Sequence, residues 1–277
     1  MTAAAPILSV VVPTRNRPET LVRCLDRLAP GAQSLDASQY EVIVADDGGA
    51  AETRALLSRA YPWARHVTGP QRGPASNRNA GARATTGEWL VFTDDDTLPD
   101  RDWLGTIAAA SDGVDVVEGR TVCRAGLRSP REHAPVNERG GYWWSCNIAV
   151  RRTAFDALGG FDERFRVPHM EDVDLRERAL AAKVPWRFAP DAVVDHPPRR
   201  EPWGTAWGRA HAAEVLFSTI HHRPFRLGRR LIDVTRVRWR SIMRAPFSRD
   251  GASAALSWMV ELVDIVWCWR GWWRALR

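Results

Sequence analysis

The sequence is short of lysine, cysteine and long apolar runs, and these shortages narrow the classes of protein it can belong to. Lys183 is the single lysine, and nearly all other basic residues are arginine. We attribute this preference to the base composition of the genome before any function. The four cysteines are far apart and form no CxxC pair, which argues against a zinc site or a disulfide framework and suits a reducing cytosol. No run of 18 apolar residues occurs, and residues 1–6 lack the pattern of a signal peptide. We therefore expect a cytoplasmic protein without a membrane-spanning helix.

Charge and tryptophan are distributed unevenly along the 277 residues. Residues 199–277 contain 15 arginines against 6 acidic residues and hold 8 of the 14 tryptophans, whereas residues 1–198 are slightly acidic. A basic, tryptophan-rich tail on a slightly acidic body indicates two functional regions. We expect one domain over residues 1–198 and a helical extension over residues 199–277.

The first two-thirds of the chain alternate between strand-like and helix-like segments. Residues 7–12, 41–45 and 89–92 are continuous apolar runs, typical of buried parallel strands. Segments with helical spacing of apolar residues follow them, for example residues 51–60. This order predicts an α/β fold in which helices cover both faces of a mostly parallel sheet.

The remaining segments are less regular. Residues 124–141 are polar and aperiodic, which predicts a loop, and residues 142–150 are predicted to be extended. Two short strands are predicted near residues 186–189 and 193–194. Three helices are expected in the extension, over residues 204–220, 227–244 and 253–273.

Polar clusters follow three of the predicted strands. They are Pro13-Thr14-Arg15-Asn16, Asp46-Asp47 and Asp94-Asp95-Asp96. Ligands bind at the carboxyl ends of strands in such sheets, so the three clusters should meet in one crevice. Adjacent carboxylates repel one another unless a cation lies among them, and carboxylate oxygens suit Mg²⁺ or Mn²⁺. The alternative is a solvated acidic turn.

Six motifs in order give a more specific indication. They are Ser9-Val-Val-Val-Pro-Thr-Arg-Asn16, Val42-Ile-Val-Ala-Asp-Asp-Gly48, Gly73-Pro-Ala-Ser-Asn-Arg-Asn-Ala-Gly81, Phe92-Thr-Asp-Asp-Asp96, Gly159-Gly-Phe-Asp-Glu-Arg-Phe165 and Glu171-Asp-Val-Asp-Leu175. Together they resemble the family 2 nucleotide-sugar glycosyltransferases of the GT-A fold, over about residues 7–196. Residues 199–277 carry no such match.

The resemblance implies a metal-dependent, inverting transfer of a sugar from a nucleoside diphosphate sugar to an acceptor hydroxyl. Asp96 and His196 would hold Mg²⁺ or Mn²⁺, although a lone histidine is also common as a structural hydrogen-bonding residue. Asp47 would accept a hydrogen bond from the imide N–H of the base, and Arg78 would face the nucleotide or diphosphate. The residues implied for nucleotide-sugar binding are Pro13, Thr14, Arg15, Asp47, Arg78, Asp94, Asp95 and Asn147.

The resemblance also implies a general base. An acceptor hydroxyl loses its proton as it attacks the anomeric carbon, and Asp172 would take that proton. Glu171 would orient the acceptor or support the loop. The alternative is that these acids only favour a helix N-terminus. Of the paired Trp143 and Trp144, one is expected in the core, and either could stack on a sugar ring.

Two other functions remain open at this point. A nucleotidyltransferase also combines aspartate-held metal with a nucleotide, but its glycine-rich and basic loop is absent after the first strand. A non-catalytic nucleotide- or carbohydrate-binding module is disfavoured by the intact Asp96 and Asp172. No motif supports nucleic acid as a partner. The acceptor could be lipid-linked or a secondary metabolite.

The last predicted helix has its own alternatives. Residues 257–273 combine apolar side chains and tryptophans with flanking arginines, as in an interfacial helix at the inner face of a membrane. The same helix could instead pack on the catalytic domain.

Overall fold

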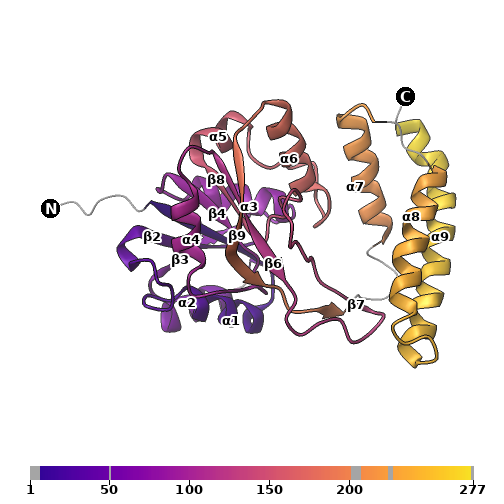
Figure 1. Cartoon of the computed structure of the whole chain (residues 1–277), viewed down its shortest axis with the longest axis horizontal. Helices are drawn as coiled ribbons and strands as arrows, with labels where there is room; N and C mark the ends of the chain where they lie inside the picture. Colours follow the sequence, from indigo (N-terminus) through magenta and orange to yellow (C-terminus); the bar gives the residue numbers. More distant parts are fainter. Residues whose placement is uncertain (1–6, 50, 201–206, 224–226, 276–277) are drawn as a thin grey trace. The chain divides into compact units, whose positions relative to one another are not determined.

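The computed structural model describes residues 7–49, 51–200, 207–223 and 227–275. The chain divides into two compact units (Figure 1). The first comprises Met1–Arg124 and Pro135–Pro197, and the second comprises Ala125–Ala134 and Pro198–Arg277. The predicted division into a domain over residues 1–198 and an extension over residues 199–277 stays a prediction.

The first unit is built on a mixed sheet of eight strands, counted over the described residues, in the order β3-β2-β1-β4-β8-β6-β9-β5. The pairings of β8 with β4 and β6, and of β5 with β9, are antiparallel, and the other pairings are parallel. The predicted α/β class with a mostly parallel sheet is therefore confirmed. The strands are β1 (Leu8–Thr14), β2 (Tyr40–Asp46), β3 (Ala64–Thr68), β4 (Trp89–Phe92), β5 (Leu98–Pro99), β6 (Val116–Val122), β8 (Ile148–Arg151) and β9 (Trp186–Asp195).

Helices cover both faces of this sheet, because successive side chains of β1 pack into two different core clusters. Val10 and Val12 lie in one core cluster, whereas Val11 between them lies in the other. Successive side chains of a strand point to opposite faces, so a strand covered on both sides is apolar throughout. The first cluster involves α1 (Pro18–Leu28), α2 (Ala51–Ala60) and α4 (Trp103–Ala110), and the second involves α3 (Pro74–Arg83), α5 (Arg152–Ala157) and α6 (Glu171–Ala181).

The structure differs from the prediction in the irregular segments. The predicted loop contains β7 (Glu132–His133), which pairs with β10 (Arg199–Arg200) in the second unit. The strand predicted over residues 142–150 begins only at Ile148. The two short strands predicted near residue 190 form the single strand β9, whose pairing with β6 shifts register after Gly119.

The second unit contains the helices α7 (Trp207–Ile220), α8 (Leu227–Ile242) and α9 (Arg249–Ala275). Val215, Val234 and Ile265 form its small core. None of the helices in the described ranges is long and apolar enough to cross a membrane. Residues 1–6, and the side chains of Trp267, Trp269, Trp272 and Trp273, lie outside the described part of the structure.

Candidate active site

The polar clusters that follow β1 and β4 meet at one edge of the sheet, as predicted. β1 and β4 are neighbours, with Val11 opposite Phe92. Beyond this point the Thr14 hydroxyl donates to Asp95 at 2.6 Å. Arg17, just after β1, contacts Asp95 at 2.8 Å and Asp96 at 3.2 Å. The carboxyl ends of these parallel strands therefore form one acidic site.

Three side chains at this edge could together hold a metal ion. Asp94, Asp96 and His196 each offer one ligand atom, and these atoms all lie within 4.8 Å of one another. His196 is buried, and its Nδ1 lies 3.0 Å from the carbonyl oxygen of Pro197. A carbonyl only accepts, so Nδ1 donates to it, and Nε2 lies 3.6 Å from the carboxylate of Asp96.

Asp95 has a different environment from its two neighbours. Its side chain is fully buried between Thr14 and Arg17. Burial raises the pKa of Asp95 to about 7, although Arg17 opposes that rise. Through these two contacts Asp95 holds the end of β1 against the acidic turn, and its role in nucleotide-sugar binding stays a prediction.

Arg78 links the acidic turn to the start of α6. One guanidinium nitrogen donates to Asp94 at 2.7 Å and another donates to Glu171 at 3.0 Å (both side chains of the second pair are buried). Burial disfavours the charged form, but Asp94 and Glu171 outweigh this effect and raise the pKa of Arg78. A permanently charged, buried guanidinium therefore separates the two acidic groups of the site.

Glu171 and Asp172 begin α6 with different exposures. Glu171 is buried, and burial together with the neighbouring Asp172 raises its pKa to about 7 against the effect of Arg78. Asp172 is partly exposed, and its carboxylate accepts from the backbone N–H of Ser145 at 3.4 Å. Burial also raises the pKa of Asp172, with Arg78 opposing. A partly exposed carboxylate with a raised pKa is suited to take up a proton.

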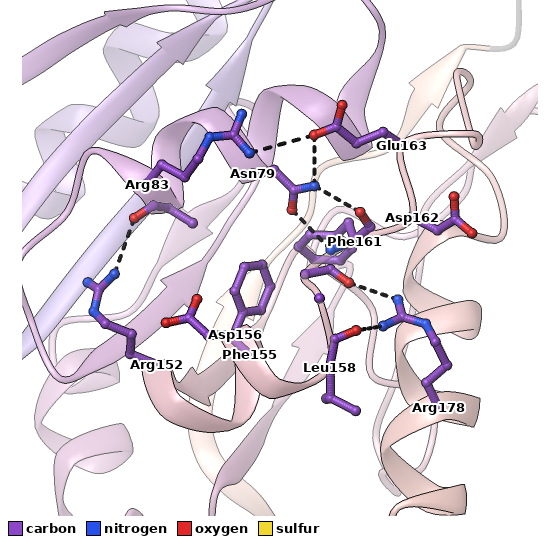
Figure 2. A pocket seen from close by; sticks show the side chains of 13 residues that line it. Asn79, Arg83, Arg152, Phe155, Asp156, Leu158, Phe161, Asp162, Glu163 and Arg178 are labelled. Atoms are coloured by element: carbon purple, nitrogen blue, oxygen red, sulfur yellow. Dashed lines mark hydrogen bonds and ion pairs between the residues drawn. The ribbon is translucent and has the colours of Figure 1, made fainter.

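A cavity of about 620 Å³ lies beside this site, between α3, α5 and α6 (Figure 2). Most polar groups around it bind one another: Asn79 exchanges two hydrogen bonds with the backbone of Phe161, at 2.8 and 3.0 Å. Gly160 has φ +72°, and a Cβ there would lie 2.8 Å from the Asn79 side chain. This turn places the Phe161 ring against Arg78, with 5.7 Å between the guanidinium carbon and the ring centroid. We therefore interpret the cavity wall as support for Arg78.

Two predicted ligand contacts compete with protein contacts. Asp47 accepts from the backbone N–H groups of Gln71 (2.5 Å) and Gly73 (3.0 Å), so it shapes the loop before α3. The Asn147 amide donates to the carbonyls of Arg120 and Ala192, both at 3.0 Å, and accepts from the Trp103 indole at 2.8 Å. Roles for Asp47 and Asn147 in nucleotide-sugar binding stay predictions.

The other predicted residues lie at the end of β1, where Pro13 and Thr14 are buried and Arg15 is exposed. Sequence reasoning missed Arg17 and Glu118, and it did not assign Asp94 to the metal. Arg17 lies directly after the predicted Pro13–Asn16 cluster, and its positive charge was the signal that could have identified it. Glu118 gave none, because its partners lie about 20 residues away in an irregular segment.

Comparison with known proteins agrees with this geometry. Residues 9–161 match the family described as Glycosyl transferase family 2. The chain is 29% identical over 215 residues to Glycosyltransferase AglE of Haloferax volcanii, covering 72% of this chain and 69% of AglE. It is 28% identical over 261 residues to Validoxylamine A glucosyltransferase of Streptomyces hygroscopicus subsp. jinggangensis, covering 77% of this chain and 59% of that protein.

A solved structure shares the fold. The mannosyltransferase PcManGT from Pyrobaculum calidifontis, in complex with GDP-Man and Mn²⁺, superposes with a TM-score of 0.58 at 21% identity. The match covers 99% of this chain and 81% of PcManGT. At this identity the likeness establishes the GT-A fold and no more.

Proposed function

Since the chain belongs to glycosyl transferase family 2 and is a glycosyltransferase, we propose that it transfers a sugar from a nucleoside diphosphate sugar to an acceptor hydroxyl with inversion. The observation that carries this proposal is the juxtaposition of two groups. Asp94, Asp96 and His196 form one cluster, and Arg78 connects it to the Glu171-Asp172 pair. Family membership argues against the nucleotidyltransferase and binding-module alternatives.

The donor set fits a divalent cation. Two carboxylates and one imidazole nitrogen lie within reach of a single ion, and carboxylates with water suit Mg²⁺ and Mn²⁺. When bound, the cation would stabilise the negative charge that develops on the leaving diphosphate. Asp96 and His196 hold it in this proposal, as the resemblance implied, with Asp94 as a third ligand.

The remaining residues of the site divide the chemistry between them. Asp172 removes the proton of the acceptor hydroxyl as the oxygen bonds to the anomeric carbon and the bond from that carbon to the phosphate oxygen breaks. This single displacement inverts the anomeric configuration. Arg78 positions Glu171 and Asp94 on either side of the reacting groups. Glu171 orients the acceptor or its loop.

The nucleotide would lie along the end of β1. Pro13, Thr14 and Arg15 border that edge, and Arg15 is exposed there and able to reach a phosphate or ribose. Asp47 retains acceptor capacity beyond its two backbone bonds, since a carboxylate accepts about four. An imide N–H of uracil, thymine or guanine satisfies this arrangement. The acceptor is a hydroxyl compound such as a lipid-linked glycan or a secondary metabolite.

The second unit provides a surface suited to an anionic membrane, the partner we assign to it. Five apolar residues of α9 recur at helical spacing and are 47–64% exposed: Leu256, Met259, Val260, Val263 and Val266. Trp239 on α8 and Met243 just after it are also exposed, next to the exposed Arg240 and Arg244. Exposed apolar side chains with flanking arginines suit the headgroup region of anionic lipid. Binding at the cytoplasmic face of a membrane is part of this proposal.

Vesicle sedimentation tests the membrane contact. The protein should sediment with phosphatidylglycerol-containing vesicles more than with phosphatidylcholine vesicles, and Val260→Glu with Val263→Glu should abolish the difference. Leu180→Glu, an exposed apolar position on α6, is the matched control. Equal sedimentation of the double variant and the control would refute the contact.

Thermal-shift measurements test the enzymatic proposal. UDP, GDP, dTDP and CDP are each added with and without Mn²⁺, and one of them should raise the Tm in a Mn²⁺-dependent way. Asp96→Asn should lose the metal-dependent shift. Asp172→Asn should keep the shift and lose sugar transfer. Absence of any shift at millimolar nucleotide, or full transfer by Asp172→Asn, would overturn the proposal.

A further inference from the structure

Two aromatic rings, one exposed and one partly exposed, lie in the segment that contacts the proposed base through the N–H of Ser145. The rings of Tyr142 and Trp144 pack together with centroids 4.9 Å apart and planes inclined by 37°. Tyr142 is 47% exposed and Trp144 is partly exposed. Between them Trp143 is buried, and its ring contacts Trp186 at 5.7 Å. The chain therefore directs one tryptophan into the core and presents the two flanking rings to solvent.

A buried carboxylate holds the backbone of this segment. Glu118 on β6 is fully buried and accepts from three consecutive N–H groups, those of Gly141, Tyr142 and Trp143, at 2.5, 2.8 and 2.6 Å. The side-chain amide of Asn137 also donates to Glu118, at 2.7 Å. These four hydrogen bonds converge on one buried carboxylate and fix the backbone of residues 141–143 against β6.

Helix α6 holds the same segment from the other side. Asp172 and Arg176 are four residues apart and so lie on one face of the helix. Asp172 accepts from the Ser145 N–H, and Arg176 donates to the carbonyl of Gly141 at 2.8 Å. The Tyr142–Trp144 pair is thus bracketed by two contacts to α6, and the base itself makes one of them.

From this arrangement we infer that Tyr142 and Trp144 form an acceptor platform, which binds the ring of a saccharide or cyclitol acceptor by stacking. The inference rests on the proposed function, because it takes Asp172 as the base that receives the acceptor proton. The position is specific: the platform residue Trp144 directly precedes the residue that binds Asp172.

The chemistry of the two rings selects the ligand class. The face of an aromatic ring carries negative charge density, and the axial C–H bonds of a pyranose or cyclohexane ring present weakly positive hydrogens. A six-membered polyol ring combines such a face with hydroxyl groups at its edge. One edge hydroxyl can then reach Asp172 while the C–H face lies on the platform. A linear polyol has the hydroxyls but no such face.

Saturation-transfer difference NMR with methyl glucosides and myo-inositol tests the platform without requiring turnover. Wild-type protein should transfer saturation to the C–H protons of these rings and not to glycerol. Trp144→Ala and Tyr142→Ala should lose this transfer, and Trp144→Phe should retain most of it. The matched control is Trp63→Ala, since Trp63 is a partly exposed member of another aromatic pair, with Tyr61 at 5.9 Å.

Kinetics provides the second readout. Trp144→Ala should raise the KM for a ring acceptor by about tenfold or more, whereas Trp63→Ala should leave this KM within about twofold of wild type. The platform is refuted if Trp144→Ala matches Trp63→Ala in both measurements, or if no ring compound gives a signal with the wild type. Failure of the proposed function gives a different result, namely ring binding without any nucleotide-dependent thermal shift.

Discussion

The guanidinium of Arg78 lies 3.0 Å from the carboxylate of Glu171, and both side chains are buried. The same guanidinium donates to Asp94, so a single side chain connects the acidic turn after β4 with the N-terminus of α6. The residues are 93 positions apart in sequence. The attraction between Arg78 and the two carboxylates offsets the cost of removing these charged groups from water.

The first prediction concerns this buried ion pair. Arg78→Met leaves the carboxylates of Asp94 and Glu171 without their cation, and the free energy of unfolding should fall by about 3–5 kcal/mol. Urea unfolding measures the change. Arg83→Met is the matched control, because Arg83 lies on the same helix and is exposed, and it should change stability by less than about 0.5 kcal/mol. Equal stability of the two variants would contradict a structural role for Arg78.

The second prediction concerns metal affinity. Asp96→Asn removes the negative charge of one ligand and His196→Gln removes the imidazole nitrogen of another, so each should weaken Mn²⁺ binding by at least about tenfold. Asp94→Asn should also weaken Mn²⁺ binding. This result would distinguish a site of three ligands from one in which Asp96 and His196 alone bind the ion. Electron paramagnetic resonance of free Mn²⁺ gives the affinities. Asp102→Asn, at an exposed position before α4, should bind Mn²⁺ like the wild type.

The third prediction concerns pH. Asp172 acts only as the carboxylate, and burial raises its pKa. As the pH falls, kcat/KM should therefore decline at a higher pH than the ordinary aspartate value of about 3.9 would give. The raised pKa means that the folded protein binds this proton more tightly than the unfolded chain does. The contribution of Asp172 to the free energy of unfolding should therefore decrease as the pH rises. A pH profile of transfer measures the first effect, and a flat profile between pH 4 and 7 would contradict it.

The fourth prediction concerns Asn147. Its amide satisfies the Trp103 indole and two backbone carbonyls, so Asn147→Ala leaves buried polar groups unpaired and should destabilise by about 1–3 kcal/mol or more. Adding Trp103→Phe should cost less than the sum of the single changes, because the two residues share a hydrogen bond. An unchanged donor KM in Asn147→Ala would assign Asn147 to the sheet. A large rise in donor KM at unchanged stability would support its predicted role in nucleotide-sugar binding.

Much of the sheet was predictable because its signals are local. The apolar runs that became β1, β2 and β4 are strands covered on both faces, and such strands lack polar alternation. The acidic turn after β4 was predictable in the same way, because the change from apolar to charged residues marks the end of a buried strand. The irregular segment at residues 142–147 was not predictable, because the bonds to Glu118 that hold its start come from a different strand.

By itself, the sequence determined the α/β class, the clustering of Thr14 with Asp95 at one sheet edge, and the acids at the start of α6. These features depend on side-chain periodicity and on the order of elements along the chain. Only the tertiary structure decided that Asp94 joins Asp96 and His196, and that Trp144 is partly exposed while Trp143 is buried. The physical reason is that these outcomes depend on contacts between residues far apart in sequence, which no local pattern of polarity encodes.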